Sequence, residues 1–135
     1  MVQMHGQYQG EKHCELTHGP SSSKIETDAP RDNNGKGERF SPTDLVGAAL
    51  GSCVLTTMAI FAEKEGIDLK GASFEVVKEM SSSPRRIASL SLKVTLPNTV
   101  PEARREWLEG VGHACPVSRS LHPDVQIPIE YSYRD

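Results

Sequence analysis

The chain has 135 residues, 24% charged residues and a formal net charge of -3, which fits one soluble domain with a single core over residues 1–135. Nucleic-acid-binding proteins usually show a clustered basic excess, whereas Arg85-Arg86 and Arg104-Arg105 are isolated pairs, so no nucleic-acid partner is expected. The N-terminus has neither a basic start nor an apolar segment. We therefore expect no signal peptide and a cytoplasmic location.

The first forty residues predict short strands and loops. Turn signals at Gln9-Gly10 and Gly19-Pro20 separate three short stretches of strand character. The expected strands run from about Gln3 to Tyr8, from Lys12 to Thr17 and from Lys24 to Thr27. The polar segment 32–37 then predicts a flexible loop.

A long helix follows, and its ends are well marked. Ser41 suits an N-cap, Pro42 the first helical position, and Asp44 the acidic position of a capping box, while Gly66 can close the helix in a left-handed conformation. Gly47 and Gly51 lie four residues apart on one face, where another helix could approach closely or where simple core packing could use the space.

The run from Leu45 to Ala62 carries no charge and is close to the length of a membrane span. Small and polar residues dilute it, acidic residues flank it, and no basic cluster sets an orientation. We therefore expect the central helix of a soluble core and no membrane partner.

The second half of the chain predicts strands, a helix and a final strand. Phe74, Val76 and Met80 alternate on one strand, and Leu90, Leu92, Val94 and Leu96 alternate on the next. An amphipathic helix should begin near Pro101, and a short helical turn should run from Cys115-Pro116 to Leu121. Alternating residues from Val125 to Tyr133 predict the last strand. The fold class is therefore α+β, with helices on one side of an antiparallel sheet.

Two of the three cysteines occupy contrasting positions. Cys53 lies midway along the uncharged helix, and Cys115 directly precedes a helix-starting proline, whereas Cys14 lies in a predicted N-terminal strand. No Cys-x-x-Cys motif supports a structural zinc site, and three scattered cysteines do not make a disulfide scaffold. A thiol within a helix and a thiol at a helix entrance suggest a redox pair, provided that they meet in space.

Three segments together resemble the OsmC/Ohr family of thiol peroxidases. They are Ser-Pro-Thr-Asp-Leu-Val-Gly-Ala-Ala-Leu-Gly-Ser-Cys at 41–53, Pro-Arg-Arg-Ile at 84–87 and Ala-Cys-Pro-Val at 114–117. The resemblance implies the OsmC-like fold, an intertwined homodimer with antiparallel sheets wrapped around two long central helices. It also implies reduction of organic hydroperoxides by Cys53, resolution of the sulfenic acid by Cys115 as a disulfide, and regeneration by a small dithiol or lipoyl-type reductant, with no metal or organic cofactor.

The family pattern also includes an arginine near the nucleophile, held by a glutamate in the first turn of the helix. The position of that glutamate is Thr43 here, and Asp44 is the next residue. The Gly-Lys-Gly segment at 35–37 makes Arg31 the closest match to the arginine, with Arg39 as the second candidate. A cation is needed because Cys53 lies about 16 Å from the helix N-terminus and burial by itself disfavours a thiolate.

Two alternatives remain open from the sequence. The first is a dimeric module that binds an apolar ligand and has little peroxidase turnover, which Thr43 in place of the glutamate supports. The second is metal binding through His113, Cys115 and His122.

Overall fold

A computed structural model describes residues 1–135, which form two compact units, Met1–Val46 and Gly47–Asp135. The boundary lies within the long helix α1 (Pro42–Lys64), and each unit is described by itself. The expectation of one domain over 1–135 stays a prediction.

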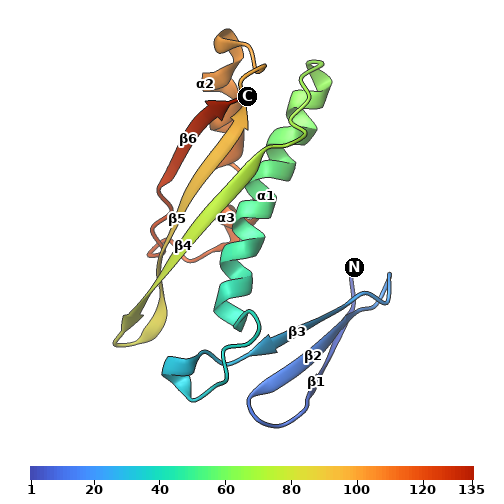
Figure 1. Ribbon diagram of the computed structural model, residues 1–135, viewed down its shortest axis with the longest axis vertical. Coiled ribbons are helices and arrows are strands. Elements are labelled where there is room, and N and C mark those ends of the chain that lie inside the picture. Colours follow the sequence, from blue (N-terminus) through green and yellow to red (C-terminus); the bar gives the residue numbers. More distant parts are fainter. The chain divides into compact units, whose positions relative to one another are not determined.

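The N-terminal unit is built on an antiparallel sheet of three strands in the order β1-β2-β3 (Figure 1). Its strands are β1 (Met4–Tyr8), β2 (His13–His18) and β3 (Lys24–Asp28), which confirms the three strands expected there. A short 3-10 helix, Arg31–Asn33, lies at the start of the segment predicted as a flexible loop.

The capping box predicted for α1 is present. The Ser41 backbone N–H donates to Asp44 Oδ2 at 2.9 Å, and the Asp44 N–H donates to Ser41 Oγ at 3.0 Å, so two N–H groups at the helix start are satisfied reciprocally. Gly66 follows the helix with a φ of 71°, as a left-handed terminator requires.

The Gly47–Asp135 unit contains a second three-stranded sheet in the order β4-β5-β6. Strand β4 (Ser73–Ser82) pairs with β5 (Arg85–Pro97) in antiparallel fashion, but β6 (Ile129–Arg134) runs parallel to β5. The expectation of an antiparallel sheet is therefore confirmed for β4 and β5 and is wrong for β6. The chain leaves β5 and returns through α2 (Glu102–His113) and α3 (Pro116–Ser120), and such a crossover lets two strands run in the same direction.

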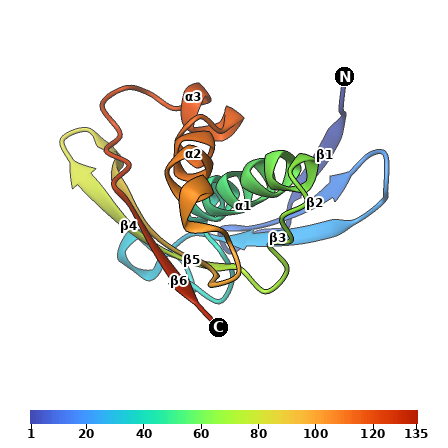
Figure 2. The same ribbon diagram turned by 90° about the horizontal axis from the view of Figure 1, so that it is seen from above.

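The helices cover one face of this sheet, as both views of the ribbon show (Figures 1 and 2). The predicted helix near Pro101 is α2 (Glu102–His113), and the predicted turn after Cys115 is α3 (Pro116–Ser120). The core beneath the helices is apolar and fully or almost fully buried, and it includes Leu50, Val54, Met58, Leu90, Leu92, Val94, Leu96 and Leu108. The alternation predicted for β5 is thus confirmed.

The glycine face of α1 packs on the sheet and not on another helix of this unit. A Cβ on Gly51 would lie 2.2 Å from the ring of Phe74, and one on Gly47 would lie 3.4 Å from Leu90 and 3.6 Å from Val76. Of the two uses considered for these glycines, close helix approach and core packing, the structure shows the second. Large side chains on β4 occupy the space that the glycines leave.

Helix α1 is long and apolar enough to cross a membrane by length and composition, and 33% of its apolar window is buried in the structure. One such helix is weak evidence, because the core helix of a soluble protein passes the same test. The expectation of no membrane partner stays a prediction.

Candidate active site

Cys53 lies in the middle of α1, at the edge of its buried stripe. Its neighbour Val54 is fully buried, whereas Cys53 itself is half-buried. The sulfur lies 3.8 Å from Thr57 Oγ1, and the Thr56 hydroxyl donates to the Cys53 carbonyl at 3.3 Å. A thiol in this position is held by its own helix and still has a path to solvent.

Cys115 occupies the N-cap of α3 and is fully buried. Its sulfur accepts the Ser118 backbone N–H at 3.4 Å, and the Ser118 hydroxyl donates to the Cys115 carbonyl at 2.9 Å. Pro116 follows at the first helical position, where a missing N–H costs nothing. The sequence prediction of a thiol at a helix entrance is confirmed.

The end of α2 brings the segment of Cys115 to α1. A Cβ on Gly112 would lie 2.6 Å from Tyr131 Oη and 3.0 Å from Met58 Sδ, so the α2 backbone packs directly on both side chains. Met58 follows Cys53 by five residues, about 7.5 Å along the helix axis. Both thiols therefore lie in one unit, on elements packed against each other, and both are free.

Tyrosine side chains of β6 border the Cys115 side of this region. The Tyr131 hydroxyl donates to the Glu109 carbonyl at 3.2 Å, and the Tyr133 hydroxyl donates to Glu109 Oε2 at 2.6 Å. Burial, then the charges of Glu109 and Cys115, raise the pKa of Tyr131 to about 12. Both tyrosines were expected only as alternating residues of the last strand, and their spacing of two places them on one face of β6.

The two candidate cations lie in the N-terminal unit and are exposed. Arg31 Nε donates to the Lys36 carbonyl at 3.3 Å, and Gly37, with a φ of 64°, packs beside the Arg31 side chain. Arg39 forms an ion pair of 3.3 Å with Glu26. Arg39 thus has a carboxylate partner in Glu26, whereas the Arg31 side chain contacts the backbone carbonyl of Lys36.

Asp44 and Thr43 lie in the first turn of α1. The Asp44 carboxylate takes part in the capping box, and Thr43 Oγ1 lies 3.2 Å from Ser41 Oγ. Asp44 precedes Cys53 by nine residues, about 13.5 Å along the helix axis. Through the capping contact, Asp44 stabilises the start of α1.

The histidines near Cys115 do not form a metal site. His113 is exposed and its ring lies 5.7 Å from the Tyr131 ring, edge to face, while His122 Nδ1 accepts the Asp124 N–H at 3.0 Å. No group of three or more His, Cys, Asp or Glu side chains is arranged to hold a metal ion. The alternative of metal binding through His113, Cys115 and His122 thus lacks support.

A groove of about 550 Å³ has a lining that begins at Leu55, two residues after Cys53 in the sequence. Its walls come from the second half of α1 and from the turn that follows. They are mainly apolar, with Leu55, Ala59, Ile67, Leu69 and Ala72, but Thr56 and the charged Glu63, Asp68 and Lys70 also line the groove. Thr56 connects the groove to the Cys53 carbonyl. An apolar chain can lie in this groove, although neither Cys53 nor Cys115 is among its lining residues.

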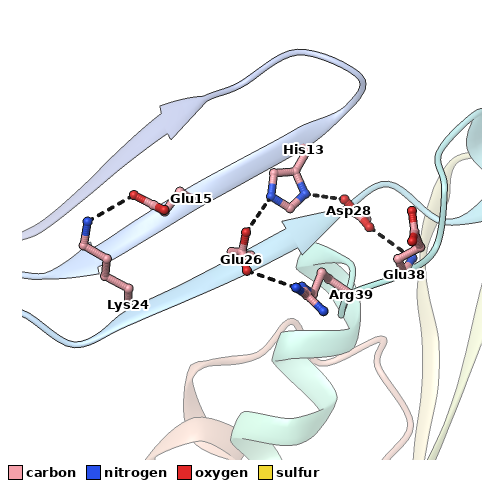
Figure 3. A network of polar contacts seen from close by, with 7 residues as sticks. All are labelled: His13, Glu15, Lys24, Glu26, Asp28, Glu38 and Arg39. Carbon is pink, nitrogen blue, oxygen red and sulfur yellow. Dashed lines mark hydrogen bonds and ion pairs between the residues drawn. The ribbon is translucent and has the colours of Figure 1, made fainter.

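A second cluster, in the N-terminal unit, was missed by the sequence analysis. His13 lies between Asp28 and Glu26, and Glu26 also pairs with Arg39 (Figure 3). The alternation of His13 with Glu15, and of Glu26 with Asp28, was a readable signal for one charged face of a sheet.

Comparison with known proteins identifies related sequences and structures. A family model described as OsmC-like protein matches residues 35–130. A proposed osmotic stress induced and detoxification response protein from Psychrobacter arcticus is 37% identical, with a TM-score of 0.92 over 97% of this chain and 96% of that chain. No curated protein sequence matches the chain.

More distant structures share the fold. An OsmC-like protein from Mycoplasma pneumoniae is 15% identical with a TM-score of 0.82, covering 100% of this chain and 98% of that one. An organic hydroperoxide resistance protein from Legionella pneumophila is 19% identical with a TM-score of 0.73, covering 98% of this chain and 96% of that one.

Proposed function

The chain belongs to the OsmC-like protein family, and from this premise we propose that it is a thiol-based peroxidase for organic hydroperoxides. The observation that carries the proposal is the pair formed by half-buried Cys53 and fully buried Cys115, on elements that pack together through Met58 and Gly112. Relatives described as organic hydroperoxide resistance proteins share the fold and support the substrate class.

The proposed reaction uses the two thiols in sequence. The Cys53 thiolate attacks one peroxide oxygen, the O–O bond breaks, and the alkoxide leaves as an alcohol after taking a proton, so Cys53 becomes a sulfenic acid. The Cys115 sulfur then attacks the Cys53 sulfur, water leaves, and a disulfide forms. A small dithiol or a lipoyl group reduces the disulfide by exchange and is itself oxidised.

The burial of the two sulfurs supports this assignment of roles. Cys53 is the more accessible thiol, and the organic part of a hydroperoxide can bind in the apolar groove, whose lining begins at Leu55, two residues further along α1. Cys115 is fully buried and is protected from direct attack by peroxide. A local movement at the entrance of α3 must bring its sulfur to bonding distance, about 2.05 Å, from Cys53.

A homodimer is part of the proposal. Helix α1 leaves Ile60 and Phe61 exposed, at 57% and 41%, and the N-terminal sheet leaves Met4, Tyr8 and Ile25 more than half exposed. Both sheets also have open edges. Exposed apolar surface and unpaired edges of this kind favour association with a second copy of the chain.

A binding protein for an apolar ligand is the second candidate function. The observation that favours it is that neither cysteine is among the residues that line the apolar groove. Thr43 at the position of the family's glutamate points in the same direction.

The two functions differ in a turnover assay with cumene hydroperoxide and dihydrolipoamide. The peroxidase hypothesis expects wild type to consume peroxide over many turnovers and Cys53→Ser to consume none. Cys115→Ser should complete one turnover and leave a sulfenic acid that dimedone traps.

Cys14→Ser is the matched control and should retain full turnover. If wild type consumes no peroxide but binds an apolar fluorescent probe saturably, the second candidate function replaces the first. If Cys53→Ser consumes peroxide at the wild-type rate and dimedone labels Cys115, the roles of the two thiols are reversed.

A further inference from the structure

One face of the N-terminal sheet carries a compact network of charges (Figure 3). The register places His13 of β2 directly opposite Asp28 of β3, and it places Glu15 opposite Glu26. These four side chains therefore project from the same face, because residues paired across antiparallel strands share a face. Asp28 is buried, with a side chain that is only 4% exposed.

Both ring nitrogens of His13 face carboxylate oxygens. Nδ1 lies 2.5 Å from Asp28 Oδ1, and Nε2 lies 3.0 Å from Glu26 Oε1. A neutral imidazole has one N–H and one lone pair, so one of these contacts would set a lone pair against a carboxylate. The arrangement therefore requires the imidazolium, which donates from both nitrogens.

The charges around His13 also favour the protonated imidazolium. Three carboxylates, those of Glu15, Glu26 and Asp28, lie on this face, and Lys24 and Arg39 pair with the first two. A charged His13 supplies the third cation, which faces the most buried carboxylate. If His13 is neutral, Asp28 keeps its charge in a buried position without a cationic side chain in hydrogen-bonding contact.

Asp28 connects His13 to the loop 29–41. Its second oxygen, Oδ2, accepts the Glu38 backbone N–H at 3.0 Å, and its own N–H donates to the Phe40 carbonyl at 3.2 Å. The same loop carries Arg39, which Glu26 holds, and it ends at the N-cap of α1. His13 thus reaches the loop through two carboxylates.

The other charged groups near His13 also belong to the loop and to the turn between β1 and β2. Lys36 of the loop pairs with Glu11 of the turn at 2.5 Å. They line a cavity of about 340 Å³ together with Gln9, His13, Asp28, Glu38 and Arg39. The Lys36–Glu11 pair provides a second, histidine-independent link across the cavity.

We propose that His13 is a proton-dependent latch: as an imidazolium it bridges Asp28 and Glu26 and holds the loop 29–41 on the hairpin, and loss of one ring proton loosens the loop. The latch lies within the N-terminal unit and does not depend on the proposed peroxidase activity. When the latch opens, His13 no longer holds Glu26, so Glu26 is a less ordered partner for Arg39. The segment that leads into α1 then becomes less ordered.

The direction of the pH dependence follows from the hydrogen bonds. The Asp28 carboxylate first, and then Glu26, raises the pKa of His13 above its ordinary value of 6.5. The stabilisation by the latch is fully present below that value and is lost as the pH rises through the raised pKa of the folded protein. His13 lowers the pKa of Asp28 and Glu26, so acid opens the latch only when these carboxylates protonate in the folded state.

Nuclear magnetic resonance of the full-length wild type tests the proposal directly. Nitrogen chemical shifts of the His13 ring should show both nitrogens protonated at pH near 6.5. The protection factor of the Glu38 amide against hydrogen exchange should fall severalfold as the pH rises through the His13 titration, because its acceptor is Asp28 Oδ2.

Variants at two histidines of the same sheet sharpen the test. His13→Gln should give a low, pH-independent protection of the Glu38 amide, and His5→Gln on β1 should leave the wild-type pH profile unchanged. A neutral His13 tautomer at pH near 6.5 in wild type, or a Glu38 protection factor that stays constant while His13 titrates, would overturn the latch. The wild-type measurements decide the matter even if His13→Gln does not fold.

Discussion

Gly51 of α1 lies directly against the ring of Phe74 of β4, and a Cβ at this position would come within 2.2 Å of the ring. Helix α1 therefore contacts the sheet at Gly51, two residues before Cys53. Because Phe74 is held by the β4–β5 pairing, the helix and the sheet fix each other's position.

Gly51→Ala should lower the free energy of unfolding by about 1–3 kcal/mol, because the added methyl group overpacks the contact with Phe74. Gly110→Ala is the matched control, since a Cβ there meets nothing within 4 Å and its φ is not positive. Gly110 lies within α2, so alanine should raise the free energy of unfolding by about 0.5–1 kcal/mol. Urea unfolding at one protein concentration measures both, and equal effects of the two changes would contradict the packing argument.

Arg31→Ala should slow the alkylation of Cys53 by iodoacetamide at neutral pH by about tenfold, because a thiolate in mid-helix needs a nearby cation. Arg39→Ala should have a smaller effect. The measurement uses a Cys14→Ser background, in which buried Cys115 reacts much more slowly than half-buried Cys53. Arg31→Lys keeps the charge and should stay close to wild type.

An unchanged alkylation profile in Arg31→Ala would show that the cation has been placed wrongly. A larger effect of Arg39→Ala than of Arg31→Ala would indicate that Arg39, which pairs with Glu26, is the cation that stabilises the Cys53 thiolate.

Glu109→Gln should lower the pKa of Tyr131 from about 12 toward its ordinary value of 10, but not all the way, because burial is the larger cause of the raised value. Tyrosinate absorbance at alkaline pH measures this, with Tyr131→Phe to assign the signal. Glu106→Gln, on the same helix, is the control and should leave the titration unchanged.

The Tyr131 hydroxyl also makes the free energy of unfolding depend on pH in the alkaline range. Since the pKa of Tyr131 is raised in the folded protein, its contribution to stability is present below the unfolded value of 10 and is lost as the pH rises toward about 12. Tyr131→Phe should therefore reduce the loss of stability across this interval. An identical loss in wild type and in Tyr131→Phe would contradict the assignment.

Sedimentation should give about twice the mass of one chain, because α1 exposes apolar side chains along its outer surface. Ile60→Asp should shift the protein toward monomer, since it puts a charge into the proposed interface. Glu106→Lys exchanges one exposed charge for another on α2 and should leave the mass unchanged. A stable wild-type monomer at micromolar concentration that turns over peroxide would contradict the dimer proposal.

The elements themselves were predictable from local patterns. The cap at Ser41 and Asp44, the terminator Gly66 and the alternation from Leu90 to Leu96 all appear as expected. Caps and turns depend on a few neighbouring residues, and the period of apolar residues depends only on the backbone geometry of a helix or strand. The position of Cys115 at a helix entrance was readable for the same reason.

Relationships between distant segments were decided by the tertiary structure. The direction of β6 depends on the path of the crossover through α2 and α3, and no local pattern records that path. From the sequence, the glycines of α1 fit close packing on a helix or on a sheet equally well, and the tertiary structure places Phe74 of β4 in the space beside Gly51. The bridge from His13 to Asp28 and Glu26 exists because the β2–β3 register puts these residues on one face, and register is set by pairing across strands, not by the order of residues within one strand.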